Sequence, residues 1–437
     1  MNRYVNQKLV TDKAEADPIS FEIIANEKTR HLTMTDYFFL FGICMVVFWA
    51  VDPFEWRLGY RAMIKHFPIV AISPAFILAL AGSVLFRKNR DHDKKHQDNY
   101  SLMITLSVFA VFVTIGSLYA KFVKGIDNGF LTMGLYTLTA PLTAWFVRKS
   151  ENPVSLIKGI LWVYFFWALV AIAMQVVHIG QAGYFHEREH LVIGALVMIY
   201  FLAKTNITHF FAMGFIAAAA LVAQKNTAYL IMLLGIFYFF LVWGLQHGKK
   251  IKDKFLRWAF WVRAILIGGF LATLVAVIYS LVKSSLPTGN PEYRLHTYEI
   301  AWNKFLSSPI WGTGFTGAAT EKFDLFTVGS STQTLPTHSD PLDILAQGGL
   351  IGFLLWIAIF IILSRQWVFL VMQPDRQLKP EVVPYLHTLY FLIFSGFIVC
   401  MFNPILNNPG LAWTFWGSVG ALLAVLKTPG SVMALKA

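Results

Sequence analysis

Long apolar segments, separated by shorter polar ones, recur from residue 34 to residue 426. Each is about 14–23 residues long, which suits a helix that crosses a hydrocarbon layer of roughly 30 Å. The pattern predicts twelve membrane-spanning helices, although the short pair on either side of residues 204–206 could instead form one re-entrant feature. The expected spans are 34–52, 68–86, 100–120, 129–147, 154–176, 190–203, 207–223, 227–244, 264–283, 342–363, 384–402 and 410–426.

The longest polar connection is expected at 284–341. It opens with SSLPTGNPEYR, which is rich in turn-forming residues. In the following RLHTYEIAWNKFL, apolar residues recur at helical spacing, which predicts an amphipathic helix on the membrane surface. These residues are Leu295, Tyr298, Trp302 and Phe305. The segment SSPIWGTGF then ends this helix. No short tandem repeat is present, so we expect one membrane domain at 34–427 with tails at 1–33 and 428–437.

Lysine and arginine positions indicate the orientation. With a cytoplasmic N-terminus, 24 of these residues fall on the cytoplasmic side and 11 on the outer side. Because cytoplasmic loops are enriched in Lys and Arg, both termini are expected in the cytoplasm and the 284–341 loop outside. The first 33 residues are polar and mixed in charge, so the first span is expected to be an uncleaved anchor. The net charge of +12 then reflects orientation rather than nucleic-acid binding.

Composition agrees with an all-α polytopic membrane protein, because the chain is 57% hydrophobic and only 14% charged. Cys44 and Cys400 lie in apolar runs and are interpreted as packing residues. Neither a phosphate-binding loop motif nor a dinucleotide fingerprint occurs. The acidic pair Asp91 and Asp93 lies in the basic cytoplasmic segment RKNRDHDKK and is not expected to bind metal. We therefore expect a reaction that needs neither a metal nor a cofactor.

His338 lies at the end of the outer loop, just before an apolar span. Asp340 fits the N-cap of that span, Pro341 its first turn, and Asp343 a position beside the positive end of the helix dipole. Helix capping is thus the expected role of the two carboxylates. For His338 two interpretations stay open, a solvated loop histidine and a general base that accepts a proton from a hydroxyl group.

Three cations are expected on the same outer side: Arg294 in the amphipathic helix, Arg188 before the sixth span and Lys225 in the turn between the seventh and eighth. Arg188 could belong to a solvated cluster with Glu187 and Glu189, and Lys225 could simply extend its charge towards water. Convergence of the three would instead suit a phosphate-bearing lipid headgroup, which arginine contacts with two donors at once.

Four segments of the second half carry a resemblance. They are ALVAQKNTAYLIMLLG, YRLHTYEIAWNKFLSSPIWGTGF, THSDPLDILAQGGLIG and FNPILNNPGLAWTFWGSVGALL. By their residues and order the chain resembles, over roughly 184–427, the O-antigen ligase and polymerase family of bacterial envelope glycan enzymes. Two departures are visible, because Lys225 stands where the family's outer turn usually has an arginine, and Gln347 where an acidic residue often follows the histidine.

The resemblance implies a glycosyltransferase of the bacterial inner membrane whose active site faces the periplasm. Its donor would be a glycan on undecaprenyl diphosphate, and an acceptor hydroxyl would displace the lipid diphosphate with inversion. His338 would be the general base, oriented by Asp340, while Arg294, Lys225 and Arg188 would bind the diphosphate. No metal or cofactor is implied. The partners would be the lipid-linked donor, an acceptor and membrane lipids.

The acceptor leaves alternatives open. A ligase that transfers the glycan to lipid A–core is preferred, and a polymerase that joins repeat units on the same carrier is the alternative. A twelve-span secondary transporter is a third hypothesis. Such transporters commonly contain internal repeats and ionisable residues at mid-membrane, whereas here Lys158 is nearly alone within a span and the long loop divides nine spans from three.

Overall fold

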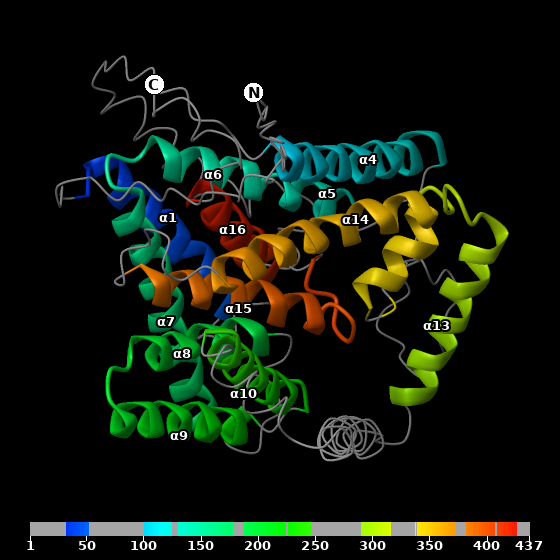
Figure 1. Ribbon diagram of the computed structural model, residues 1–437. Coiled ribbons are helices and arrows are strands. Elements are labelled where there is room, and N and C mark those ends of the chain that lie inside the picture. Colours follow the sequence, from blue (N-terminus) through cyan, green and yellow to red (C-terminus); the bar gives the residue numbers. More distant parts are fainter. Residues whose placement is uncertain are drawn as a thin grey trace, which may run out of the picture.

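The computed structural model describes residues 32–51, 100–124, 130–177, 188–223, 226–246, 290–315, 337, 339–372, 382–406 and 409–425. Every regular element within these residues is a helix (Figure 1). The expected spans 68–86 and 264–283, residues 1–31 and the C-terminal tail lie outside the described residues, as does most of the second half of the 284–341 loop. The count of twelve spans and the full loop therefore stay predictions.

The described helices coincide with the ten remaining expected spans and the amphipathic segment. They are α1 (Met34–Val51), α4 (Tyr100–Lys124), α5 (Phe130–Thr137), α6 (Thr139–Lys149), α7 (Pro153–Val177), α8 (Glu189–Leu202), α9 (Asn206–Ala223), α10 (Asn226–Gln246), α13 (Asn290–Ser307), α14 (Asp340–Met372), α15 (Val383–Val399) and α16 (Pro409–Val425). Within α4, α7, α9 and α14 lie the four described segments that are long and apolar enough to cross a membrane. The apolar stretches of α1, α8, α10, α15 and α16 are shorter.

Local sequence explains several helix boundaries. Thr33 and Asp36 cap α1 reciprocally, because Asp36 N–H donates to Thr33 Oγ1 at 3.3 Å and Thr33 N–H donates to Asp36 Oδ2 at 2.8 Å. Asn152 caps α7 through its side-chain oxygen, which accepts the Ser155 N–H at 3.0 Å. The expected span 129–147 is divided into α5 and α6 at Leu138. Pro141 explains the break, because its ring would clash with the backbone carbonyl group four residues earlier in a continuous helix.

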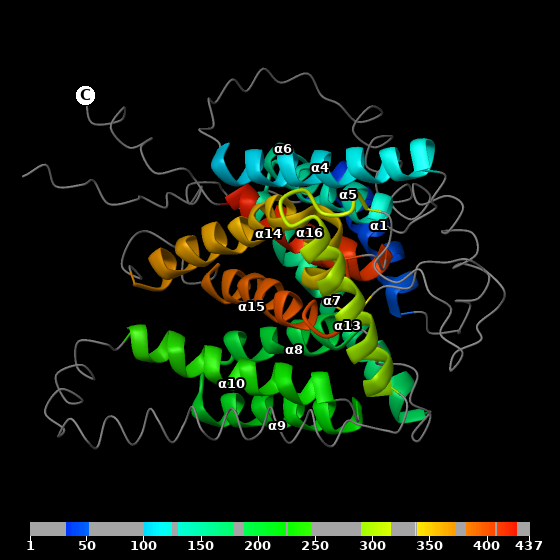
Figure 2. The ribbon, with the colours of Figure 1, turned by 90° about the vertical axis from the view of Figure 1, so that its right-hand side faces the viewer.

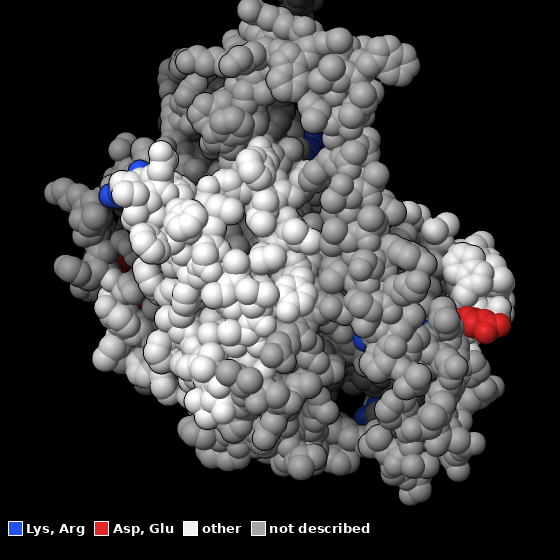
Figure 3. All heavy atoms as spheres, turned by 90° about the horizontal axis from the view of Figure 1, so that it is seen from below, with Lys and Arg blue, Asp and Glu red and all other residues white. Residues whose placement is uncertain are grey.

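The apolar surface of the bundle faces outwards as well as inwards. Helix α4 buries Leu102, Leu106, Phe109 and Val113, whereas Ile104, Val111, Ile115 and Phe122 on its other side are 52–77% exposed. The described part of the face seen from below is almost free of charged atoms (Figure 3). A helix that is apolar on all sides, and not covered by protein, needs a lipid environment, so the protein is a membrane protein.

Helix α16 forms the centre of the bundle (Figures 1 and 2). Its residues from 410 to 423 are all buried, and it packs against α1, α6 and α15. Trp413 and Trp416 are its largest buried side chains. At the C-terminal end of α16, Arg148 Nη2 donates to the carbonyl oxygen of Leu423 at 2.9 Å, so α6 and α16 end on the same side.

Helix ends gather at two opposite ends of the bundle. The starts of α8 and α10 and the start of α14 lie at one end, which we call the site end, and α13 crosses this end beside α14 (Figure 1). At the opposite end, the Lys158 ammonium lies 5.2 Å from the ring centroid of Tyr385, which gives the one charge expected inside a span an aromatic partner. Helices that alternate in direction across a membrane produce this arrangement.

Helix α14 is broken near its start, which the sequence did not predict. Gly349 has φ 59° and ψ −161°, a conformation that is essentially restricted to glycine. Residues 340–348 therefore form a separate short helix that packs beside α13, and the long span follows the break. The Gly348–Gly349 pair explains the break, because small flexible residues in succession are a common cause of sharp helix kinks.

Candidate functional site

The residues just before α14 fold back onto its first turn. Thr337 donates its backbone N–H to both carboxylate oxygens of Asp343, at 3.3 and 3.2 Å. Thr337 Oγ1 donates to the Ser339 carbonyl oxygen at 3.0 Å and accepts the Ser339 N–H at 3.1 Å. His338 itself lies outside the described residues. Its two neighbours along the chain are buried and fixed by these hydrogen bonds.

Asp340 is the first residue of α14 and is fully buried. Its Oδ2 accepts the backbone N–H groups of Ile405 and Leu406 at 2.9 and 3.0 Å, and its own N–H donates to the Cys400 carbonyl oxygen at 2.9 Å. The carboxylate therefore fixes the connection between α15 and α16 against the start of α14. Asp343 is also fully buried, and its carboxylate accepts the backbone N–H of Thr337 and so fixes that residue against the first turn of α14.

Helix α13 brings Arg294 to the start of α14. Ala301 is fully buried against Ala346, so the two helices approach closely. Tyr298, one turn after Arg294, lies within electrostatic range of both Arg294 and Asp343. Trp302, one helical turn after Tyr298, is 48% exposed, so this face of α13 is only partly covered by the described protein.

The segment that follows α13 closes the break in α14. Thr313 N–H donates to the Ala346 carbonyl oxygen at 3.0 Å, Gly314 N–H donates to that of Gln347 at 3.0 Å, and Leu350 N–H donates to that of Pro309 at 2.8 Å. Thr313 Oγ1 also donates to Gln347 Oε1 at 3.0 Å. Backbone groups released by the break are thus satisfied within the protein, as a membrane environment requires.

Two glycines allow this contact. A Cβ atom on Gly312 would overlap the backbone of Gln347, and one on Gly349 would overlap the backbone of Ile310. Phe315 then inserts between Gly116 and Gly348 and meets Phe112 edge-on, with ring centroids 5.8 Å apart. Helix α4, the turn after α13 and the start of α14 therefore form one packed unit at the site end.

The starts of α8 and α10 form the neighbouring part of the site end. Arg188 precedes α8 and is 2% exposed, and Glu189 is also 2% exposed, so the alternative of a solvated charge cluster is wrong for these two residues. Thr227 Oγ1 donates to Glu189 Oε1 at 3.3 Å and thereby joins the two helix starts. Lys225, two residues before Thr227, lies outside the described residues.

Helix α15 connects these two parts. A Cβ atom on Gly396 would lie 3.6 Å from the His190 ring, so the start of α8 packs directly against α15. Cys400, about one helical turn after Gly396, bonds to Asp340 through its carbonyl oxygen. Arg188 and the segment around His338 therefore approach the same end of α15. The sequence predicted three cations on one side, of which the structure describes Arg188 and Arg294 at this end. It did not predict the roles of Glu189, Thr227 and Tyr298. Only their spacing from Arg188, Lys225 and Arg294 could have indicated these roles.

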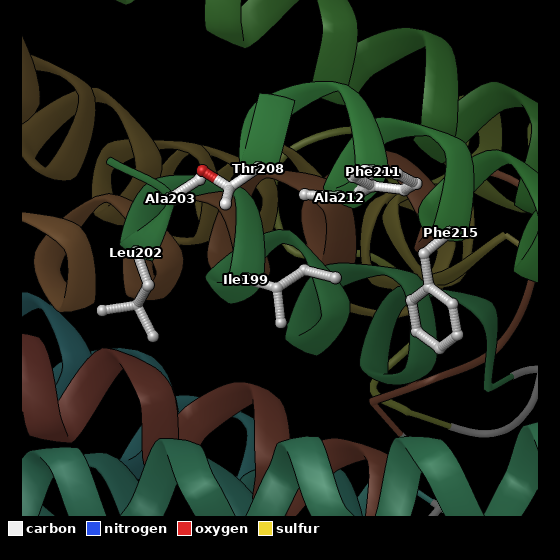
Figure 4. A pocket seen from close by; sticks show the side chains of 7 residues that line it. All are labelled: Ile199, Leu202, Ala203, Thr208, Phe211, Ala212 and Phe215. Carbon is white, nitrogen blue, oxygen red and sulfur yellow. The ribbon is translucent and has the colours of Figure 1, made fainter. Parts of the chain in front are cut away.

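An apolar groove of about 420 Å³ lies at the opposite end from these residues, between the end of α8 and the start of α9 (Figure 4). Its lining consists of Ile199, Leu202, Ala203, Thr208, Phe211, Ala212 and Phe215. Only the Thr208 side chain contributes a polar group, so the groove has no residue for acid–base or phosphate chemistry. Within the described residues, no group of three or more His, Cys, Asp and Glu side chains is arranged to hold a metal ion.

These features define the class of the protein: an α-helical membrane protein with ionisable side chains gathered at one end of its bundle. Residues 210–357 match a family model described as O-Antigen ligase. This match confirms, for that segment, the resemblance predicted from the sequence. The segment contains Lys225, Arg294, His338 and Asp340 but not Arg188. No curated protein matches the chain.

Proposed function

We propose that the protein transfers a glycan from an undecaprenyl diphosphate carrier to an acceptor hydroxyl at the periplasmic face of a bacterial inner membrane. The family match supports a ligase- or polymerase-type membrane enzyme that acts on lipid-linked glycans. One observation carries the proposal furthest. Helix α13, which bears Arg294, packs on the start of α14, and the segment just before that start contains His338.

The proposed reaction is a displacement at the anomeric carbon. The acceptor oxygen forms the new glycosidic bond, the bond to the diphosphate oxygen breaks, and the diphosphate leaves with the bonding electrons. His338 accepts the proton of the acceptor hydroxyl. Arg294, Lys225 and Arg188 stabilise the negative charge that grows on the leaving diphosphate. Since the donor is already activated, no nucleotide is consumed.

Asp340 has a more limited part in this proposal. Its Oδ2 accepts two backbone N–H groups from the connection before α16. A carboxylate with these bonds is suited to fix the backbone on which His338 lies. We propose that Asp340 orients the histidine through this backbone, together with Asp343, which accepts the N–H of the residue just before His338.

Ligase activity towards lipid A–core is the form that we propose, and a polymerase would use the same donor chemistry with another repeat unit as acceptor. The envelope glycans of a deletion strain test this choice. A ligase predicts loss of capped lipopolysaccharide while the lipid-linked polymer persists, whereas single-repeat products would show a polymerase. Purified protein that consumes no lipid-linked glycan, but moves a solute along an ion gradient, would identify a transporter instead.

A further inference from the structure

Tyr298 lies one helical turn after Arg294, on the side of α13 that faces α14. Residues four apart on a helix are neighbours on its surface, so the phenol and the guanidinium point to the same region. The carboxylate of Asp343, at the start of α14, is close enough to Tyr298 to interact with it electrostatically. Tyr298 is therefore a polar side chain between two elements of the site end.

Both of these α13 side chains retain hydrogen-bonding capacity. The Arg294 Nε–H is buried and has no hydrogen-bond partner among the described residues. The Tyr298 hydroxyl likewise makes no hydrogen bond within the part of the chain that the structure describes. A buried donor without an acceptor costs about 1–3 kcal/mol, so the Arg294 Nε–H calls for a partner such as a bound water, ion or ligand.

The hydroxyl is also in the protonation state that a donor needs. Burial raises the pKa of Tyr298, the nearby Arg294 cation lowers it, and the Asp343 carboxylate raises it; the net result is a pKa above the ordinary tyrosine value. The phenol therefore stays protonated at neutral pH and can donate to an anion. The Tyr298 side chain is half-buried, so its ring has less conformational freedom than that of an exposed tyrosine.

We propose that Tyr298 is a further substrate-binding residue, whose hydroxyl donates to the same diphosphate group that Arg294 binds. This inference rests on the proposed function, because it takes the lipid diphosphate as the anion. A guanidinium fork and a phenol from one helix face give a phosphate group donors from two directions, which fixes its orientation as well as its charge.

The test compares Tyr298→Phe with the wild-type protein in detergent. The substitution keeps the ring and removes only the hydroxyl, so the melting temperature should stay close to that of the wild type. Binding of undecaprenyl diphosphate should weaken by about tenfold, in line with the loss of a hydrogen bond to a charged group. Undecaprenol, which lacks the diphosphate, should bind equally to both proteins. Tyr119→Phe is the matched control, because Tyr119 is 47% exposed on α4 and should leave binding unchanged.

The double variant Arg294→Ala/Tyr298→Phe shows whether the two residues share one anion. If they do, the loss in the double variant should be clearly smaller than the product of the two single losses. Equal binding by wild type and Tyr298→Phe, or fully multiplicative losses, would overturn the role of Tyr298. Failure of the wild-type protein to bind undecaprenyl diphosphate at all would instead overturn the proposed donor, and with it this inference.

Discussion

At the scale of single residues, the most informative feature is the pair of buried carboxylates at the start of α14. Asp340 and Asp343 both accept backbone N–H groups from segments outside the helix. The sequence predicted Asp340 at the N-cap and Asp343 in the first turn, with capping of this helix as their role, whereas the printed bonds of both carboxylates go to segments outside it. It could not predict their partners, since Ile405 lies 65 residues away from Asp340 along the chain.

The general-base role is tested by His338→Ala. The residue precedes the helix, so its removal should leave insertion and folding intact. Activity with lipid-linked donor and purified acceptor should fall roughly 10²–10⁴-fold, the usual contribution of a positioned base. His296→Ala, on α13, should retain much more activity at a matched protein level. If His338→Ala keeps more than about a tenth of the wild-type rate, the loss is smaller than the low end of that range, and the histidine is at most a binding residue.

The diphosphate role of Arg294 predicts a different pattern. Arg294→Lys keeps the charge and loses the planar fork, so most activity should be lost. Lys225→Arg should be tolerated or mildly beneficial, because an arginine can make both a charge contact and a two-donor contact with phosphate. Steady-state rates with the lipid-linked donor measure both. Near-normal turnover by Arg294→Ala at normal expression would remove Arg294 from the site.

At the scale of elements, the break in α14 and the turn after α13 are two halves of one contact. Hydropathy predicted the span but not the break, because hydropathy records how apolar a segment is and not how its backbone bends. The partners of the broken turn lie more than thirty residues earlier, at 309–314. The glycines were visible in the sequence, whereas the contact that requires them was not.

This contact predicts that Gly312→Ala is strongly destabilising. Gly312 has φ 69°, and a Cβ there would also overlap the backbone of Gln347. The strained backbone alone should cost about 1–3 kcal/mol. Gly214→Ala is the matched control, because nothing lies within 4 Å of the added Cβ and alanine is the better helix former. Thermal unfolding in detergent should show a lower midpoint for Gly312→Ala only; equal midpoints would contradict the proposed importance of the contact.

At the scale of the whole molecule, the topology was the most predictable property. The expected spans are long, apolar and separated by polar turns, so ten of them coincide with described helices to within a few residues, except where α14 extends further and α5 and α6 divide. The site was less predictable, because it is formed by helix starts far apart in the chain. The sequence indicated which side those starts share, and only packing through α15 shows that they approach one another.

The orientation of the molecule predicts where a thiol reagent will act. A cysteine at Thr332, in a protein without Cys44 and Cys400, should react with a membrane-impermeant reagent in intact spheroplasts, because the 284–341 loop is expected outside. A cysteine at Asp93 should be protected until the membrane is opened. The reverse pattern would overturn the orientation and the periplasmic site.

The hydrogen bonds of Asp340 also set an order of events during synthesis. The carboxylate of Asp340 accepts the N–H groups of Ile405 and Leu406, and its backbone N–H donates to the Cys400 carbonyl oxygen, so all three partners follow α14 in the chain. Until that region has been made, these buried polar groups of Asp340 lack their partners and the start of α14 cannot settle into its final position. Helix α13 and its arginine are synthesised long before then. The start of α14 is therefore expected to reach its final position only after residues 400–406 have been synthesised, well after α13 and its arginine.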